Sequence, residues 1–327
     1  MRDKRIRAVL ALAGAVLFAS SPAARAETFP NHPLRLIVPY AAGGGTDAVA
    51  RLVAKGMEQK LGQPVVVENN GTGGGNLASQ LAASAAPDGH TILMANQGPM
   101  VVNPYLFKKL AVDPLTAFEP VTLIARTPLV LVVPKASKFK SFAGLIAYGK
   151  ANAGALTYGS AGNGSASHLA TEMLLKQAAI DAVHVPYKGA SPALTDLLGG
   201  RSDFMVTTLP SVLGFITSGE MIPLAVTSRD RVAKLLPDVP TIAESGFPEH
   251  ESAAWYGFVV PKGTPASVIG ILHGAAVSAL ATPQIKERLE SEGSTIVGDR
   301  PEQFGAMMKA EAARWKAFLA GAGISAD

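Results

Sequence analysis

The sequence has no cysteine among its 327 residues. This absence excludes disulfides, thiolate metal ligands, a cysteine nucleophile and a lipid-modified cysteine. Aromatic residues make up only 6% of the chain and charged residues 17%, whereas 48% is hydrophobic. Beyond the N-terminal segment, no run reaches the roughly twenty uninterrupted apolar residues that a transmembrane helix needs. The composition is that of a globular chain long enough for two domains.

Signatures of common enzymes are also missing. There is no G-x-S-x-G nucleophile elbow, no G-x-x-x-x-G-K-[ST] phosphate loop and no complete G-x-G-x-x-G. No two of the six histidines have the H-x-x-x-H spacing of a zinc site. We therefore expect no catalytic residue, no bound metal and no cofactor.

The first 26 residues have the pattern of a secretory signal peptide. A cationic head that includes Arg2 and Arg7 precedes an apolar run over Ala8–Ala19, and Ala24-Arg25-Ala26 is a small-x-small cleavage site. The apolar run is too short to span a bilayer, although a retained anchoring helix is the alternative. We expect cleavage near Ala26 and a periplasmic mature protein.

The positive charge of the chain lies in this segment. Residues 1–26 hold five of the 29 lysines and arginines and one of the 25 acidic residues, so the remainder carries 24 of each. A near-neutral protein without basic runs gives no support for nucleic acid or an anionic membrane as a partner.

The mature chain alternates short apolar runs with glycine turns and amphipathic helices. Such a pattern predicts an α/β protein with an open parallel sheet covered by helices on both faces. From about Trp255 the chain is expected to return to the first domain. We predict two doubly wound domains, 27–127 plus 252–327 and 128–251, joined by two short crossing strands that form a hinge beside a ligand cleft.

Two loops of similar pattern stand in the two predicted domains. In each, an aromatic residue (Tyr40 or Tyr158) ends a strand, two glycines spaced two residues apart follow within six residues, and a hydroxyl residue (Thr46 or Ser165) comes directly after the second glycine. Glycine allows the close approach of a ligand, and a helix N-terminus offers free N–H donors and a positive dipole end. Together with weaker candidates at other strand ends, the predicted ligand-binding residues are Tyr40, Ala41, Gly43, Gly44, Gly45, Thr46, Asp47, Asn96, Gln97, Ser160, Gly162, Gly164, Ser165, Ser167, His168, Thr207 and Thr208.

Neither loop contains arginine or lysine, so neutral donors and water would hold an anion there. A plain βα turn is the alternative for either loop alone, and the repetition of the pattern favours a site. Asp47 is expected to cap a helix as well as to face the ligand. For His168, helix packing is as good an explanation as ligand contact.

The sequence resembles the substrate-binding receptors of tripartite tricarboxylate transporters, the Bug family. The matching stretches include Val38–Asp47, Pro87–Thr91, Tyr158–Ser165 with His168, Val185–Gly189 and Trp255–Gly257. The resemblance implies a type II periplasmic binding-protein fold that closes on a small carboxylate, and membrane subunits of the transporter as partners. It also implies that the loops matching 40–47 and 158–165 clasp the carboxylate, partly through water. We expect a monomer.

Three positions depart from the pattern of the family. Asn70 replaces a frequent arginine, His90 a frequent tyrosine, and Thr207 stands where many members carry an acidic residue. By the resemblance, Thr207 faces the distal part of the ligand, so a neutral, hydroxylated or aromatic carboxylate is favoured over an amino acid. A secreted enzyme acting on a carboxylated substrate and a ligand sensor for a two-component system stay open as alternatives.

Overall fold

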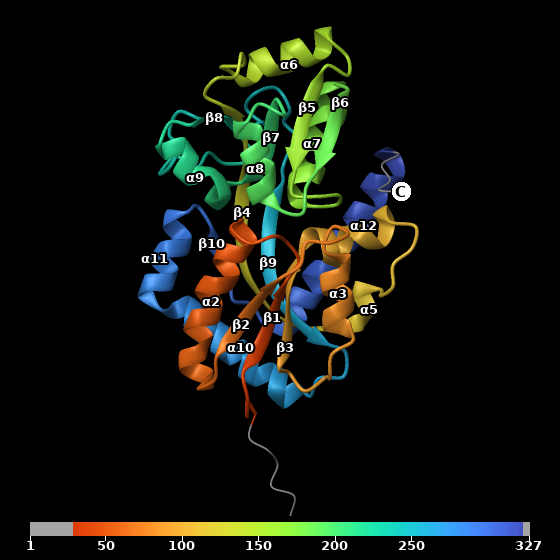
Figure 1. The fold of residues 1–327 in the computed structure, drawn as a ribbon, viewed down its shortest axis with the longest axis vertical. Coiled ribbons are helices and arrows are strands. Elements are labelled where there is room, and N and C mark those ends of the chain that lie inside the picture. Colours follow the sequence, from red (N-terminus) through yellow and green to blue (C-terminus); the bar gives the residue numbers. More distant parts are fainter. Residues whose placement is uncertain (1–28, 323–327) are drawn as a thin grey trace, which may run out of the picture.

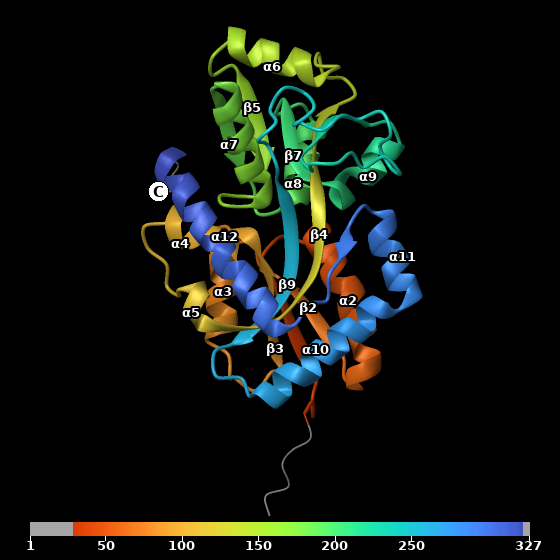
Figure 2. The same ribbon diagram turned by 180° about the vertical axis from the view of Figure 1, so that it is seen from behind.

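The computed structural model describes residues 29–322. The expected signal peptide, its cleavage point and residues 323–327 lie outside the described residues. The described part has two lobes, each a sheet flanked by helices, with the long strands β4 (Phe118–Pro134) and β9 (Ala253–Pro261) running between them (Figures 1 and 2).

The first lobe begins with a parallel sheet. Strand β1 pairs in parallel with both β2 and β3, and β3 pairs antiparallel with β9. Helices cover the sheet, among them α12 across its back in Figure 2. The elements of this lobe are β1 (Leu34–Val38), α2 (Gly45–Leu61), β2 (Val65–Asn69), α3 (Asn76–Ala83), β3 (Thr91–Asn96), η1 (Gly98–Val102), α4 (Asn103–Leu106), α5 (Pro114–Ala117), α10 (Ala266–Ala281), α11 (Pro283–Ser291), β10 (Thr295–Ile296) and α12 (Pro301–Ala322).

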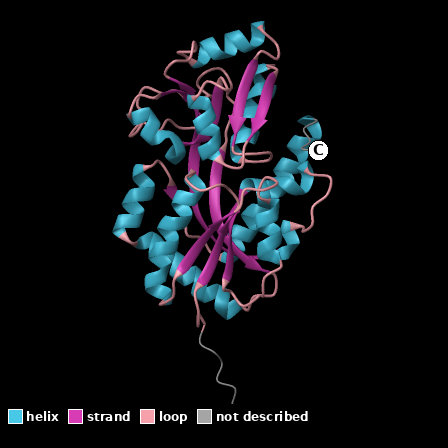
Figure 3. Cartoon of the chain, viewed as in Figure 1, coloured by secondary structure: helices cyan, strands magenta, loops and turns pink. Residues whose placement is uncertain are grey.

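The second lobe repeats the arrangement of helices around a sheet (Figure 3). Strand β5 pairs in parallel with β6 and β7, whereas β4 pairs antiparallel with β7 and β8. Its elements are α6 (Phe142–Ala151), β5 (Leu156–Ser160), α7 (Ala166–Ala178), β6 (Ala182–Pro186), α8 (Ala190–Leu198), β7 (Phe204–Thr208), α9 (Leu209–Thr217) and β8 (Met221–Val226).

The amphipathic patterns of the sequence are found on the buried faces of these elements. Along α2, Val49, Val53, Met57 and Leu61 are buried at helical spacing, and the helix stops at Gly62, which has a left-handed φ of 67°. In α12, Phe304, Met308 and Trp315 are buried at helical spacing, and Phe318 is partly buried against the same core.

The expectation of entirely parallel sheets is wrong, because the two strands shared by the lobes run antiparallel to their neighbours. The crossing is also not a short strand. In β4, residues up to Pro128 pair with β9, and residues from Leu129 pair with β7, within one strand of 17 residues. A strand that bridges two sheets carries no local sequence signal of the change, because its apolar character continues across both.

One predicted helix start is also wrong. The pair Ser191-Pro192 predicts a capped helix start, but α8 begins at Ala190 and Gly189 is the residue before it. Gly189 has a φ of 158° and approaches the backbone nitrogen of Ala41 so closely that a Cβ would lie 2.9 Å from it. Helix α8 therefore begins beside Ala41 of the first lobe, one residue before Ser191.

Candidate functional site

The starts of four helices surround one cavity between the lobes. Its wall includes Gly45 and Thr46 at the start of α2, Ser165 and Ala166 at the start of α7, Ala190 at the start of α8, and Thr208 just before α9. All four helices follow strands that have a parallel neighbour, so their N-termini lie at the strand ends where α/β proteins bind ligands. The first N–H groups of a helix have no partner within it and carry a positive partial charge.

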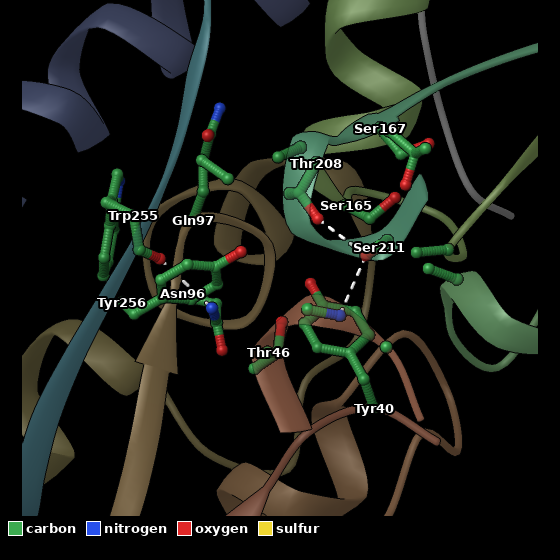
Figure 4. A pocket seen from close by; sticks show the side chains of 17 residues that line it. Tyr40, Thr46, Asn96, Gln97, Ser165, Ser167, Thr208, Ser211, Trp255 and Tyr256 are labelled. Carbon is green, nitrogen blue, oxygen red and sulfur yellow. Dashed lines mark hydrogen bonds between the residues drawn. The ribbon is translucent and has the colours of Figure 1, made fainter. Parts of the chain in front are cut away.

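The cavity has about 500 Å³ of atom-free space, a volume that includes open solvent at its mouth. None of the 17 residues that line it is charged (Figure 4). The lining residues are Tyr40, Gly44, Gly45, Thr46, Asn96, Gln97, Ala161, Ser165, Ala166, Ser167, Ala190, Thr207, Thr208, Ser211, Ala254, Trp255 and Tyr256.

The first glycine loop touches the second lobe directly. The Gly45 N–H donates to the Ser211 hydroxyl oxygen at 2.8 Å, and this oxygen is also 2.8 Å from the hydroxyl of Thr208 (Figure 4). Nearby, the Ala41 N–H donates to the carbonyl of Lys188 at 2.8 Å. The two lobes are therefore in contact around the cavity.

Asp47 stabilises this loop from behind and does not line the cavity. Its carboxylate accepts hydrogen bonds from the Gly43 N–H (3.0 Å), the Asn69 amide (2.9 Å) and the Arg51 guanidinium (3.1 Å). Burial alone would raise the pKa of Asp47, but the hydrogen bonds from Arg51, Gly43 and Asn69 outweigh it and lower the pKa. An ionised Asp47 is neutralised by Arg51, so it adds no free negative charge to the site.

The second glycine loop presents serine hydroxyls. Ser165 caps α7 by accepting the His168 N–H at 3.2 Å, and Ser167 donates to the carbonyl of Val206. Both serines are buried and both line the cavity. A hydroxyl group can accept a hydrogen bond and donate its proton at the same time. The Ser165 hydroxyl, which accepts from His168, can therefore still donate its proton to a bound ligand.

The strand ends of the first lobe supply further polar atoms. Asn96 donates to the carbonyl of Trp255 at 3.1 Å, while its buried Oδ1 has no hydrogen-bond partner among the described residues. The Tyr256 hydroxyl lies near the hydroxyls of Thr46, Thr127 and Thr208, but within the described part of the chain it makes no hydrogen bond of regular geometry. Burial raises the pKa of Tyr256 to about 12, so this hydroxyl is neutral at physiological pH. These atoms are unsatisfied in the protein alone, which is a feature of a polar ligand site.

Ten of the predicted ligand-binding residues line the cavity. They are Tyr40, Gly44, Gly45, Thr46, Asn96, Gln97, Ser165, Ser167, Thr207 and Thr208. Gln97 lines the cavity, but its amide group is used within the protein. In the orientation that gives both amide atoms a partner, the amide donates to the carbonyl of Ala253 and accepts from the Trp315 indole, each at 3.2 Å.

Seven predicted residues do not line the cavity: Ala41, Gly43, Asp47, Ser160, Gly162, Gly164 and His168. We predicted that polar atoms of these residues bind the ligand. In the structure, these atoms instead form hydrogen bonds within the protein. Asp47 binds Gly43, Asn69 and Arg51, whereas His168 accepts from the Gly164 N–H at 3.2 Å. A helix with a polar residue in its first turn has the same sequence pattern whether that residue faces the ligand or the loop.

Seven lining residues were not predicted: Ala161, Ala166, Ala190, Ser211, Ala254, Trp255 and Tyr256. Ser211 follows Thr208 by one helical turn, and its spacing is a signal that could have been used. Small alanines give no such signal, and the Trp255-Tyr256 segment enters because β9 crosses between the lobes.

Neither a metal centre nor a membrane-spanning helix is found in residues 29–322. No group of three or more His, Asp or Glu side chains could hold an ion there. No single helix in this range is long and apolar enough to cross a membrane; α10 and α11 reach that length and apolarity only together, as a pair bent by 71°.

The geometry can be compared with known proteins. The family model described as "Tripartite tricarboxylate transporter family receptor" matches residues 49–324. The chain belongs to this receptor family. It is 38% identical over 316 residues to a protein of the tcbD-tcbE intergenic region of Pseudomonas sp., with 96% of this chain and 94% of that protein covered. It is 34% identical over 316 residues to BugT of Bordetella pertussis, with 96% of each chain covered.

Solved structures of family members have the same fold as this receptor. Periplasmic binding protein BugD is 37% identical with a TM-score of 0.87, covering 91% of this chain and 99% of BugD. An R. palustris protein solved with adipate is 34% identical with a TM-score of 0.87 over 91% of this chain and 99% of that one. MatC of Rhodopseudomonas palustris, solved with malate, is 32% identical with a TM-score of 0.84 over 88% and 99%. The receptor therefore has a periplasmic binding-protein fold, and its family serves tripartite transporters as solute receptors.

Proposed function

We propose that the receptor binds one small carboxylic acid in the cavity and delivers it unchanged to the membrane subunits of a tripartite tricarboxylate transporter. The acid would be di- or tricarboxylic, hydroxylated or aromatic. Binding would take place in the periplasm, after removal of residues 1–26, by a monomeric protein. The alternatives of enzyme and sensor have no observation in their favour.

The observation that carries this proposal is the convergence of four helix N-termini on a cavity without a charged wall residue. N–H groups and hydroxyls aimed at an anion stabilise it without a salt bridge. A neutral site also avoids the strong binding of a buried ion pair, which suits a shuttle that has to release its ligand. The bound adipate and malate of two relatives agree in chemical class with such a site.

The chemical requirement for a carboxylate is testable by melting and calorimetry. The full chain is expressed and the protein is recovered from the periplasm. Its measured mass is compared with the mass expected for cleavage after Ala26. We expect at least one of adipate, malate, citrate or benzoate to raise the melting temperature, because a ligand of the folded state stabilises it by mass action. Amino acids should give a smaller shift.

The control is the methyl ester of each acid that binds. Titration calorimetry should show at least about a tenfold weaker affinity for the ester at the clasped carboxylate, since charge-assisted hydrogen bonds are lost. Equal affinity for acid and ester would refute the anion site. Recovery of a chemically altered acid after incubation would refute transport without catalysis.

We also propose that residues 27–127 with 252–327 move against residues 128–251 about the two crossings. The support is the change of partner along β4, from β9 up to Pro128 to β7 from Leu129, so that each side of this point belongs to a different sheet. The contacts of Gly45 with Ser211 and of Ala41 with Lys188 would form only when the lobes are closed.

Small-angle scattering tests this motion. A ligand that contacts both lobes only in the closed state shifts the equilibrium toward closure. Saturation with the tightest-binding acid should reduce the radius of gyration by on the order of an ångström, as expected for hinge closure. An unchanged scattering profile at proven saturation would mean that the cavity is preformed.

A further inference from the structure

The second glycine loop, residues 161–165, has a backbone that its own side chains do not fix. Gly162 and Gly164 have φ angles of 122° and 75°, values that glycine adopts easily but leaves as easily. The loop still has to place Ala161, Ser165 and Ala166 on the cavity wall. Within the loop the Ser165 N–H donates to the Gly162 carbonyl at 3.1 Å, and the other bonds that hold its shape come from outside it.

One connection runs from Gly162 to a histidine on the neighbouring strand. The Gly162 N–H donates to the Ser160 hydroxyl oxygen at 3.1 Å, and this oxygen lies 2.6 Å from Nε2 of His184. Because the Ser160 oxygen accepts from Gly162, its single proton is free to be donated to His184. Donation by Ser160 makes Nε2 of His184 an unprotonated acceptor, and this is the tautomer that the proposal below adopts and that the nitrogen spectra test.

A second connection runs from Gly164 to the first turn of α7. The Gly164 N–H donates to Nδ1 of His168 at 3.2 Å. The backbone N–H of His168 in turn donates to the Ser165 hydroxyl oxygen at 3.2 Å. Nδ1 of His168 must be unprotonated to accept, so a neutral His168 carries its proton on Nε2.

The two imidazoles are held together by stacking. The His168 ring lies 4.2 Å from the His184 ring at an interplanar angle of 14°, and the His184 ring lies 4.8 Å from the Tyr158 ring at the same angle. Tyr158 donates its hydroxyl proton to Glu172, whose carboxylate lies 3.9 Å from Nε2 of His168. The titratable groups that face this pair are therefore Tyr158 and Glu172.

Burial keeps both rings neutral. It lowers the pKa of His168 to about 3, with a further contribution from His184, and the pKa of His184 to about 4. Protonation of His168 at Nδ1 would place an N–H against the Gly164 N–H and break their hydrogen bond. The connections of both His168 and His184 to the loop therefore depend on unprotonated ring nitrogens. The acceptor state should therefore persist throughout the neutral and mildly acidic range.

We propose that His168 and His184 are positioning residues that hold the second glycine loop in its ligand-binding shape through their unprotonated ring nitrogens. They act through the N–H groups of Gly164 and Gly162 and do not touch the ligand. The expected effect of these histidines on ligand affinity rests on the proposed carboxylate site. Their expected effect on the shape of the loop does not.

Paired substitutions separate the acceptor from the packing of the ring. His168→Asn keeps an acceptor near the place of Nδ1, and His168→Leu removes it; His184→Gln and His184→Leu form the corresponding pair for Nε2. Hydrogen exchange of the Gly162 and Gly164 amides is measured in all four variants and in the parent protein, together with the melting temperature. Adipate and malate binding is measured by calorimetry.

We expect His168→Leu to speed exchange at Gly164, and His184→Leu at Gly162, by about tenfold or more, the size expected for loss of a buried hydrogen bond. The amide variants should stay within about threefold of the parent. Whichever of the two acids binds the parent should bind the leucine variants about tenfold more weakly. Folded leucine variants with unchanged exchange and affinity would overturn the proposal.

The ring nitrogens give a direct spectroscopic test in the unsubstituted protein. Long-range ¹H–¹⁵N spectra should show an unprotonated Nδ1 in His168 and an unprotonated Nε2 in His184 from pH 8 down to pH 5. A doubly protonated ring at pH 6 would overturn the proposal. If neither acid binds the parent, the proposed function loses support, but the exchange and nitrogen data still decide the role of the histidines.

Discussion

Replacing Gly45 with alanine should weaken ligand binding by about 10- to 100-fold. A Cβ at this position would lie 2.7 Å from the Thr208 hydroxyl oxygen and 3.0 Å from that of Ser211, both on the opposite lobe. Overpacking of this kind costs about 1–3 kcal/mol, and under the proposed hinge motion the cost falls on the closed state alone. Because only the closed form binds the acid fully, the apparent affinity decreases in proportion to the population of the closed form.

A glycine away from the cavity wall is the control. Gly214 lies within helix α9, where alanine adopts the backbone without strain, and its added Cβ would meet nothing within 4 Å. Gly214→Ala should therefore bind within about threefold of the parent. Calorimetry with the tightest-binding acid decides between them; parental affinity in Gly45→Ala would show that closure at this contact is not required.

Replacing Thr207 with aspartate should weaken the binding of di- and tricarboxylates by at least about 100-fold at pH 8. Thr207 is 2% exposed and lies on a cavity wall without any charged residue. A second buried negative charge beside the bound acid would be uncompensated, and such charges cost several kcal/mol. Acids that carry an amino group should lose less affinity, because the ammonium can pair with the new carboxylate.

Thr207→Asn is the control for size and polarity, since asparagine has the shape of aspartate without its charge. Burial should raise the pKa of the introduced carboxyl, so that binding by Thr207→Asp recovers partly as the pH falls toward 5. Titrations of both variants at pH 8 and pH 5 measure this difference. Equal affinities at pH 8 would show that Thr207 does not face the ligand.

Local sequence patterns were enough to predict a two-domain α/β protein and to indicate the family. The family model and the solved structures of relatives confirm both the family and the binding-protein fold. Helices α2 and α10 begin at Gly45 and Ala266, directly after Gly44 and Pro265, because caps and turns act over a few residues. Helix α11 and the full extent of β4 were missed. Helix α11 is short, and β4 has the composition of an ordinary apolar run.

The sequence by itself determined which segments form helix starts after strands, and that no lysine or arginine lies within the two glycine loops. These properties depend on neighbouring residues and hold whatever the chain does elsewhere. Only the tertiary structure decided which polar groups of those segments face the cavity. Asp47 is paired with Arg51 and Asn69, His168 with Gly164, and Ser211 and Tyr256 enter the wall from distant parts of the chain. Near partners such as Arg51 and distant partners such as Asn69 can bind the same group, and only the positions in space settle whether that group bonds within the protein or faces the cavity.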